Sequence, residues 1–401
     1  MKTHEAPSNA SLMNVSAGGG ENATFFWVGD EPRIVRAAVF EEVKKIVVRD
    51  DYPDPQPGLD EVVVRVRYCA ICGSDVKNWL HKIYEAPLVM GHEFCGEVVE
   101  LGPGMEDSGF HVGDKVTGIN PPWDTRSGAS MKGLGVFQDG AFAEFVRVPR
   151  EALFRVPDEV SHLHGALIES FAVAVRAVAW AGLWPSVDVP AGSAPPPAGQ
   201  TGTGAGTSTG AGTGTGTGTG PGVVVVGGGA IGLATLATFL AGRPEPPPAY
   251  SLVVEPHAFL REKALQLGAT HALPPNKGKL RRLFRKLGEP WWAFEAAGLE
   301  ATLLLAMDLV APRGTVVVEG VGKGHVTFPS YLLNSKEVGL RGSLSHDVGD
   351  VRRAIDLVRS GAVDLDPFVS EVIPLGEIES GFAKYVEPGE RKFVKILVEV
   401  S

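Results

Sequence analysis

The feature that most constrains the fold of this chain is a run of four valines followed by a glycine-rich turn, VVVVGGGAIG at residues 223–232. Four β-branched residues in succession favour a buried strand, and the uncharged stretch 233–241 after the turn is typical of a helix. Gly227, Gly229 and Gly232 complete a GxGxxG pattern: the first makes the turn, the second admits a phosphate close to the backbone, and the third lets the helix pack on the strand. The sequence therefore predicts a strand, a dinucleotide-binding turn and a helix whose N-terminus faces a pyrophosphate.

A second strand, SLVVE at residues 251–255, ends in Glu255. A carboxylate at this strand end accepts hydrogen bonds from the adenosine ribose and repels a 2′-phosphate, which favours NAD over NADP. Arg261 lies six residues further on and keeps NADP possible, because a guanidinium could reach that phosphate; the alternative is a solvated helix residue. Ile231, inside the glycine-rich turn, is also expected to contact the cofactor.

Further strand-like segments follow in WWAFEAAG, GTVVVEGVG and VGLRGS, with a helical stretch at residues 299–309 between the first two. Strands that alternate with helices imply a parallel, doubly wound sheet. The uncharged run 223–242 is about long enough to cross a bilayer, but its valines and glycines favour a buried strand and a tight turn instead.

A second informative stretch, residues 69–93, brings a thiol, an imidazole and carboxylates together between two strand-like runs. Cys72 and His92 are twenty residues apart, so the intervening loop can bring both onto one cation such as zinc. Glu93 follows directly and is a further candidate ligand. Cys69 and Cys72 form a CxxC pair, which could instead be a redox couple or two small buried residues.

Four motifs occur in a fixed order: CGSD at 72–75, GHE at 91–93, GDKV at 113–116 and VVVVGGGAIG at 223–232. Together they resemble the zinc-dependent medium-chain alcohol dehydrogenase family, on its polyol and secondary-alcohol side, which includes sorbitol, butanediol and threonine dehydrogenases. The resemblance spans about residues 36–400 and implies an α/β protein with a GroES-like β-barrel catalytic domain and a Rossmann domain. The expected divisions are a disordered N-terminal extension (1–33), the catalytic domain (34–184), a flexible low-complexity Thr/Gly/Pro insertion (185–222), the NAD-binding Rossmann domain (223–343) and a return to the catalytic domain (344–401).

The resemblance also implies one catalytic zinc ion, held by Cys72, His92 and either Glu169 or Glu93. Glu169 occupies the place where relatives carry a third protein ligand; it could act directly or through a water, and its alternative interpretation is a solvated or capping carboxylate. Many relatives hold a structural zinc with four cysteines, but residues 118–140 contain no cysteine. A structural zinc ion is therefore excluded by ligand count.

Three further residues receive roles from the same resemblance. Asp75 would hold the ring of His92, and Ser74, whose alternative is an ordinary turn serine, would take the proton of the alcohol. Lys77 stands where many relatives place a histidine that relays this proton. An unperturbed lysine has a pKa of about 10.4 and arrives already protonated, so we expect Lys77 to act as a fixed positive charge near the cofactor ribose.

Asn78 and Trp79 are expected to line the substrate pocket, although Trp79 could equally be a core aromatic residue. Cys69 and Cys95 are expected to be packing residues. Lys395 could be a surface lysine or could point toward a cofactor phosphate.

Composition limits the remaining possibilities. The net charge of −10 over 401 residues argues against nucleic acid or an anionic membrane as a partner. Three cysteines suit a reducing compartment, and the N-terminus lacks the apolar core of a signal peptide, so a cytoplasmic location is expected. The resemblance implies a small-molecule alcohol or polyol as the substrate and a homodimer or homotetramer.

Two other functions remain open from the sequence. One is a zinc-free quinone-type reductase of the same fold, a class that generally lacks the pair Cys72 and His92. The other is a catalytically silent nucleotide-binding homologue, for which the insertion and the unusual Lys77 are the hints.

Overall fold

The computed structural model describes residues 34–120, 133–183, 222–242, 247–322 and 325–401, which belong to one compact unit, Ile34–Ser401. The predicted N-terminal extension, residues 185–221 of the predicted insertion and residues 121–132 of the loop after the GDKV motif lie outside the described residues.

Two mainly antiparallel sheets contain the strands from the N-terminal part of the chain. The smaller has the order β2-β1-β4, and the larger has the order β15-β16-β3-β5-β6-β8, with β7 also paired to β3. The central strand β3 is buried along most of both faces, unlike a strand with one face in water, and its edges are paired with β5, β7 and β16. These strands are β1 (Ile34–Glu42), β2 (Lys45–Pro53), β3 (Glu61–Ala70), β4 (Leu88–Val89), β5 (Glu93–Leu101), β6 (Lys115–Gly118), β7 (Phe145–Pro149), β8 (Leu153–Arg155), β15 (Val369–Pro374) and β16 (Lys395–Glu399).

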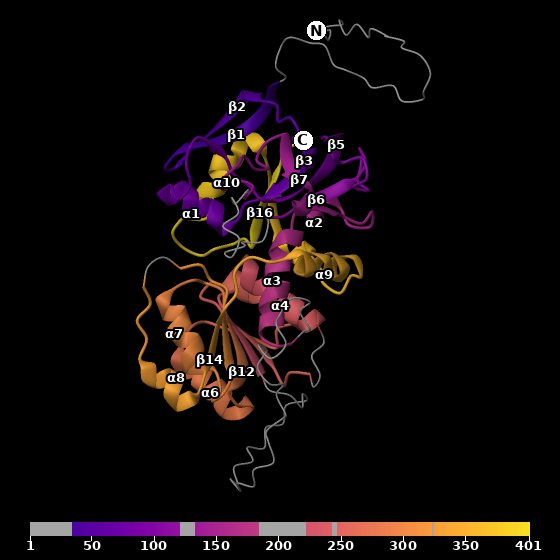
Figure 1. The fold of residues 1–401 in the computed structure, drawn as a ribbon. Helices are drawn as coiled ribbons and strands as arrows, with labels where there is room; N and C mark the ends of the chain where they lie inside the picture. Colours follow the sequence, from indigo (N-terminus) through magenta and orange to yellow (C-terminus); the bar gives the residue numbers. More distant parts are fainter. Residues whose placement is uncertain (1–33, 121–132, 184–221, 243–246, 323–324) are drawn as a thin grey trace, which may run out of the picture. The chain divides into compact units, whose positions relative to one another are not determined.

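The C-terminal segment returns to this sheet. Strand β16 pairs antiparallel with β3, so that Leu397 lies opposite Ala70, and parallel with β15. Figure 1 shows β16, in yellow, beside the indigo β3. This pairing supports the proposed return of the chain to the catalytic domain. The associated helices are α1 (Gly73–His81), α2 (His162–Gly165), α3 (Ile168–Trp180), α9 (Val348–Arg359) and α10 (Ile378–Lys384), with short 3-10 helices at η1 (Arg150–Ala152), η2 (Asp366–Phe368) and η3 (Leu375–Glu377).

The apolar stretch around residues 163–181 forms two helices, α2 and α3. The side chain of Ser161 caps α2 by accepting a hydrogen bond from the backbone N–H of His164. The N–H of Leu167 then bonds the carbonyl of His164, three residues back rather than four, which tightens the turn and separates α2 from α3. As a result, Glu169 lies in the first turn of α3.

The remaining strands form one six-stranded parallel sheet in the order β11-β10-β9-β12-β13-β14. This is the doubly wound arrangement in which the chain starts at the centre and builds outward in both directions. Figure 1 shows α6, α7 and α8 on one side of the sheet and α4 on the other. The strands are β9 (Gly222–Val226), β10 (Ser251–Val254), β11 (His271–Leu273), β12 (Pro290–Glu295), β13 (Thr315–Val318) and β14 (Gly339–Gly342), and the helices are α4 (Ala230–Ala241), α5 (Ala258–Gln266), α6 (Lys277–Leu287), α7 (Glu300–Leu309) and α8 (Ser330–Lys336).

Strand β9 lies at the centre of this sheet, and all five of its residues are buried. This is why its sequence is continuously apolar rather than alternating. None of the helices in the described part of the chain combines the length and the apolar character needed to span a membrane. The run 223–242 forms the predicted strand, turn and helix.

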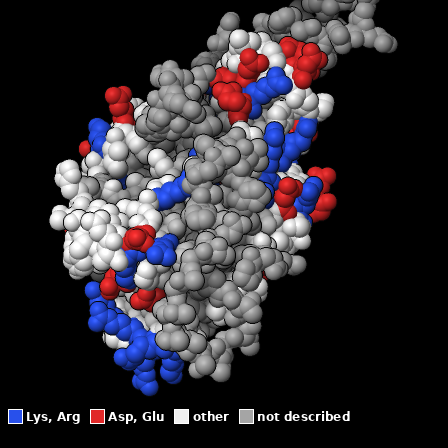
Figure 2. Space-filling view, turned by 60° about the horizontal axis from the view of Figure 1, so that its bottom comes forward, with Lys and Arg blue, Asp and Glu red and all other residues white. Residues whose placement is uncertain are grey.

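Charged side chains are unevenly distributed in the described part of the molecule. Figure 2 shows acidic and basic groups interspersed over much of one face, with a group of Lys and Arg side chains at one end. Helix α6 alone carries six exposed basic residues and no acidic one, while its apolar residues Leu280 and Phe284 are buried. The basic residues of α6 are Lys277, Lys279, Arg281, Arg282, Arg285 and Lys286.

Candidate active site

The first part of the candidate site is built by the junction between β4 and β5. Gly91 has a φ of 94°, a conformation that strongly favours glycine, and a Cβ at this position would lie only 2.8 Å from the Sγ atom of Cys69. The chain turns there and enters β5 with His92 and Glu93 buried at its start. Helix α1 begins just after Cys72 and brings its thiol to the same place.

Cys72, His92 and Glu93 form a cluster in which the potential ligand atoms all lie within 4.8 Å of one another. A sulfur, an imidazole nitrogen and a carboxylate oxygen are a donor set that zinc prefers. In addition, the buried Oε1 atom of Glu93 has no hydrogen-bond partner among the described residues. The three residues therefore fit a zinc ion by donor chemistry and by burial.

Asp75 and Ser74 lie beside this cluster, on the first turn of α1. The Oδ1 atom of Asp75 is 3.5 Å from Nδ1 of His92, and its Oδ2 atom accepts a hydrogen bond from the backbone N–H of Cys72. Burial acts to lower the pKa of His92, but the negative charges of Asp75 and Cys72 outweigh it and raise that pKa well above its usual value. The hydroxyl of Ser74 donates to the Sγ atom of Cys72 at 3.2 Å and lies 3.5 Å from Nε2 of His92.

Glu93 also has a cationic partner that the sequence did not reveal. Its Oε2 atom forms an ion pair with the ammonium group of Lys395 and accepts a hydrogen bond of 2.8 Å from the hydroxyl of Ser170. Burial acts to lower the pKa of Lys395, but the charges of Glu93 and Cys72 raise it overall. Both sequence-based interpretations of Lys395 are wrong, because its ammonium group is buried and engaged by Glu93 and Ser170.

Glu169 has a different partner from Glu93. Its Oε1 atom lies 3.0 Å from Nε2 of His346, a fully buried residue that precedes α9, and Glu169 is not part of the cluster that contains Cys72. Burial opposes ionisation of Glu169, but the hydrogen bond with His346 and the charges of His346 and His92 lower its pKa. The geometry thus groups Glu93, rather than Glu169, with Cys72 and His92.

His346 was not predicted as a site residue. It lies in the polar segment SLSHD, and no local pattern distinguishes it from a surface histidine. Asp347 and Asp350 cap α9 next to it, and both accept hydrogen bonds from Arg176 of α3. This connection between α3 and α9 holds His346 against Glu169.

The remaining residues of α1 point to different surroundings. The ammonium group of Lys77 donates a hydrogen bond to the carbonyl of Val321, just after β13 of the parallel sheet. Asn78 accepts a hydrogen bond from the N–H of Tyr84 and is fully buried, and the ring of Trp79 packs edge-on against Phe382. Asn78 and Trp79 therefore make the contacts of core residues rather than of pocket residues.

The three cysteines are unpaired. Burial raises the pKa of Cys69 and raises that of Cys95 to about 12, so neither thiol is activated. Both behave as the packing residues expected from the sequence, and Cys69 and Cys72 form no disulfide.

The glycine-rich turn has the geometry that the sequence predicts. Gly227 has a φ of 103°, and a Cβ on Gly232 would lie 1.9 Å from the carbonyl oxygen of Gly227. A Cβ on Gly229 would meet nothing within 4 Å, so this position leaves open space for a ligand. Ile231 is half-buried in the first turn of α4, where a pyrophosphate would bind.

Glu255 follows β10 and folds back over this turn. Its Oε2 atom accepts a hydrogen bond of 2.7 Å from the N–H of Gly228, and its Oε1 atom accepts one of 2.9 Å from the N–H of His257. Arg261 donates to the backbone carbonyls of Glu255 and Pro256. Arg261 thus stabilises the turn after β10, a contact that neither of its sequence-based interpretations includes.

Comparison with known families agrees with this geometry. Residues 58–158 match the family described as "Alcohol dehydrogenase GroES-like domain", and residues 250–360 match "Zinc-binding dehydrogenase". The two matches together span more than half of the chain. The chain belongs to the zinc-dependent medium-chain alcohol dehydrogenase family.

Curated relatives and solved structures support the same assignment. "Probable D-xylulose reductase A" of Aspergillus fumigatus is 26% identical, and the alignment covers 87% of this chain and 92% of the relative. L-threonine 3-dehydrogenase of Shewanella sediminis is 24% identical, and the alignment covers 83% of this chain and 91% of the relative. A zinc-binding dehydrogenase of Sinorhizobium meliloti solved with NADP is 27% identical, with a TM-score of 0.75, and covers 92% of this chain and 99% of its own. The 2R,3R-butanediol dehydrogenase of Bacillus subtilis is 26% identical, with a TM-score of 0.73, and covers 92% and 100%.

These findings confirm several predictions made from the sequence. The fold class, a GroES-like domain with a Rossmann-type parallel sheet, is confirmed. The class of activity is confirmed as well: an alcohol dehydrogenase that uses zinc and NAD(P). The individual site residues stay predictions, which the geometry above supports to different degrees.

Proposed function

We propose that this chain oxidises a polyol or another secondary alcohol with NAD as the hydride acceptor, and that it catalyses the reverse reduction. The observation that carries this proposal is the convergence of Cys72, His92 and Glu93 in a buried cluster beside Ser74. Lys77, on the same helix, reaches the edge of the dinucleotide-binding sheet at Val321. Helix α1 therefore carries Ser74, beside the cluster, and Lys77, which contacts the loop after β13 of the parallel sheet.

Cys72, His92 and Glu93 would hold the zinc ion, with Glu169 acting on it through a water molecule. When bound, zinc supplies a Lewis acid that favours loss of the alcohol proton, and NAD supplies the hydride acceptor. Lys395 restrains one oxygen of Glu93 and leaves Oε1 without a protein hydrogen bond among the described residues. That oxygen is the one we assign to the metal.

The residues around the cluster would divide the proton chemistry. Ser74 would relay the proton of the alcohol, releasing its own hydroxyl proton toward water as it accepts the new one, and Asp75 orients the ring of His92 through Nδ1. Lys77 donates a hydrogen bond to the carbonyl of Val321, and a lysine of ordinary pKa is protonated at neutral pH, which supports a role as a fixed positive charge rather than as a base.

A small molecule is the substrate class that the family assignment gives. We further propose a cytoplasmic homodimer or homotetramer with no nucleic acid or membrane partner. The net charge of −10 and the three unpaired cysteines support this reading. The buried cluster also weighs against a zinc-free quinone-type reductase and against a catalytically silent homologue.

The metal content of the purified chain and of two alanine variants tests the proposal. The wild type should contain one zinc ion per chain and reduce NAD with members of a panel of polyols, amino alcohols and secondary alcohols, followed by the absorbance of reduced nicotinamide. Cys72→Ala should lose the zinc ion and more activity than the roughly 10–100-fold typical of losing a residue that only supports a ligand. Cys69→Ala, a buried cysteine three residues away, should keep the metal and most of the activity. Two zinc ions per chain, or an active Cys72→Ala, would refute the proposed site.

A further inference from the structure

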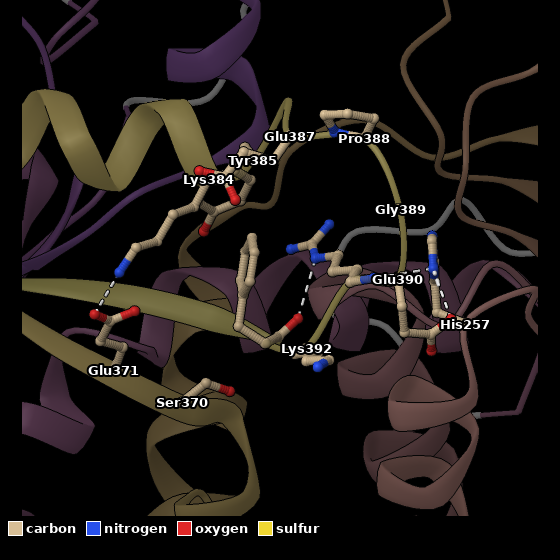
Figure 3. A pocket seen from close by; sticks show the side chains of 12 residues that line it. His257, Ser370, Glu371, Lys384, Tyr385, Glu387, Pro388, Gly389, Glu390 and Lys392 are labelled. Carbon is tan, nitrogen blue, oxygen red and sulfur yellow. Dashed lines mark hydrogen bonds and ion pairs between the residues drawn. The ribbon is translucent and has the colours of Figure 1, made fainter.

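A second cavity lies away from the cluster of Cys72, between the loop that precedes β16 and the start of α5. It has a volume of about 460 Å³ and is lined by charged side chains of both signs. Figure 3 shows His257 beside Gly389 and Glu390 of the loop, with Lys384, Glu371 and Ser370 on the opposite side of the cavity. The residues that matter for the argument are His257, Glu387, Glu390, Arg391 and Lys392.

The carboxylate of Glu390 lies at the N-terminus of α5. Its Oε1 atom accepts a hydrogen bond of 3.1 Å from the backbone N–H of Phe259, and its Oε2 atom lies 3.6 Å from Nδ1 of His257. The hydrogen bond from Phe259 is the main cause of the lowered pKa of Glu390. The first N–H groups of a helix are a natural site for an anion, and in this protein they are occupied by a side chain of the chain itself.

Two basic residues lie near Glu390, and both are engaged with backbone groups. Nδ1 of His257 accepts a hydrogen bond of 3.1 Å from the backbone N–H of Arg391, and the same atom lies 3.6 Å from Oε2 of Glu390. The guanidinium group of Arg391 donates to the carbonyls of Phe393 and Val394 and packs over the rings of Tyr385 and Phe393. Among the described residues, no lysine or arginine forms an ion pair with the carboxylate of Glu390, which keeps its hydrogen bond to the start of α5.

This position matters because α5 starts next to the ribose-binding carboxylate. Glu255 precedes Ala258, the first residue of α5, by three positions, and its Oε1 atom accepts a hydrogen bond from the N–H of His257. In this fold the carboxylate at the strand end binds the 2′-hydroxyl of the adenosine ribose. The 2′-phosphate of NADP is attached at the same oxygen, so it would lie beside the N–H groups that Glu390 already occupies.

We propose that Glu390 is a second determinant of cofactor choice: its carboxylate occupies the anion position at the start of α5 that a 2′-phosphate would need, and so it reinforces Glu255 in favouring NAD over NADP. The proposal rests on the NAD-dependent function proposed above. It differs from the role of Glu255 because Glu390 comes from the far end of the chain and would act at the N–H groups of α5 rather than at a ribose hydroxyl. Lys392, on the same loop, carries the opposite charge and provides a test in the other direction.

The test measures dissociation constants of NAD and NADP, and of AMP and adenosine 2′,5′-bisphosphate, for the full chain. Glu390→Gln should strengthen the binding of NADP and the bisphosphate about three- to tenfold relative to the binding of NAD and AMP. The effect should be no larger, since the charge is exposed and partly screened by solvent. Glu390→Asp, which keeps the charge, should discriminate like the wild type. Glu387→Gln is the matched control, because Glu387 lines the same cavity and makes no hydrogen bond to α5 among the described residues.

Three outcomes would overturn the proposal. If Glu390→Gln changes the dissociation constants of NAD and NADP equally, the proposal is wrong. It is also wrong if Glu387→Gln produces the same shift as Glu390→Gln, which would indicate a general charge effect. Weaker NADP binding in Lys392→Gln with no gain in Glu390→Gln would mean that the cavity attracts the phosphate instead. If the wild type binds neither dinucleotide, the proposed function fails together with this inference, whereas tight NAD binding with an unchanged ratio removes only the inference.

Discussion

Two glutamates buried in the same chain have opposite electrostatic surroundings. Glu93, at the start of β5, is paired with the ammonium group of Lys395 and accepts a hydrogen bond from Ser170. Glu319, directly after β13, accepts one hydrogen bond of 2.7 Å from the hydroxyl of Thr235, and its Oε1 atom has no partner among the described residues. Burial raises the pKa of Glu319 to about 8, and the nearby charge of Glu295 adds to the increase.

The comparison teaches that burial alone does not decide the charge of a carboxyl group. A buried carboxylate stays ionised when a cation sits within contact distance, and it takes up a proton when its only partner is a hydroxyl. In the antiparallel sheet, the carboxylate of Glu93 lies against the ammonium group of Lys395. The dinucleotide-binding sheet instead contains a carboxyl group, Glu319, that is protonated at neutral pH.

Removing the cation should have the largest effect on stability. Lys395→Met keeps the length of the side chain but leaves Glu93 buried without its partner, which typically costs about 3–5 kcal/mol. The midpoint of urea unfolding of the metal-free protein measures this loss. Adding Glu93→Gln should restore part of it, because the uncompensated charge is then gone. A loss below about 1 kcal/mol in Lys395→Met would contradict the pairing.

Replacing the protonated carboxyl should have a smaller, pH-dependent effect. The pKa of Glu319 is higher in the folded chain than its ordinary value of 4.5, so its contribution to stability is full below pH 4.5 and is lost as the pH rises through about 8. Glu319→Gln, a neutral side chain of the same shape, should remove this loss. Relative to wild type, the variant should gain roughly 2–4 kcal/mol between pH 5 and pH 8, at no more than about 1.4 kcal/mol per pH unit.

Thermal or urea unfolding at several pH values measures that gain. Glu387→Gln, an exposed substitution of the same kind, should show no such pH dependence. A constant difference between wild type and Glu319→Gln from pH 5 to pH 8 would mean that Glu319 titrates normally.

The smallest effect should come from the single hydrogen bond of Glu319. Thr235→Val removes the hydroxyl and should cost about 1 kcal/mol at pH 6. Because this hydrogen bond lowers the pKa of Glu319, its loss should raise that pKa further and move the decline in stability to higher pH. The same unfolding measurements apply. Thr238→Val is the control: Thr238 lies on the same helix and is buried, but its hydroxyl has no partner among the described residues, so this change should cost nothing.

Much of the fold was predictable because its signals are local. The GxGxxG turn, Glu255 and the alternating strands each occupy a short stretch, so the order of the parallel sheet follows from rules of connection. The grouping of Cys72, His92 and Asp75 was also foreseeable, since a helix start and a strand start within twenty residues can be brought together by one loop.

The partners of the buried acids could not be predicted in the same way. Lys395 and His346 reach Glu93 and Glu169 from distant parts of the chain, and neither residue belongs to a recognisable local pattern. The same reason explains why the contacts of Arg261 and Trp79 could not be read from the sequence. Their contacts, with backbone carbonyls and with Phe382, depend on how the elements pack and not on the neighbouring sequence.

The antiparallel pairing of β16 with β3 has a consequence for the order of events during synthesis. Tyr68 and Glu399, which are hydrogen-bonded across this pair, are 331 positions apart in the chain. A ribosome therefore delivers Cys72, His92 and Glu93 long before it delivers the lysine that compensates Glu93. While the parallel sheet is being translated, the edge of β3 is unpaired and Glu93 has no Lys395 to contact, because β16 has not yet been made. The cluster of Cys72, His92 and Glu93 can reach its final form only after Lys395 has left the ribosome.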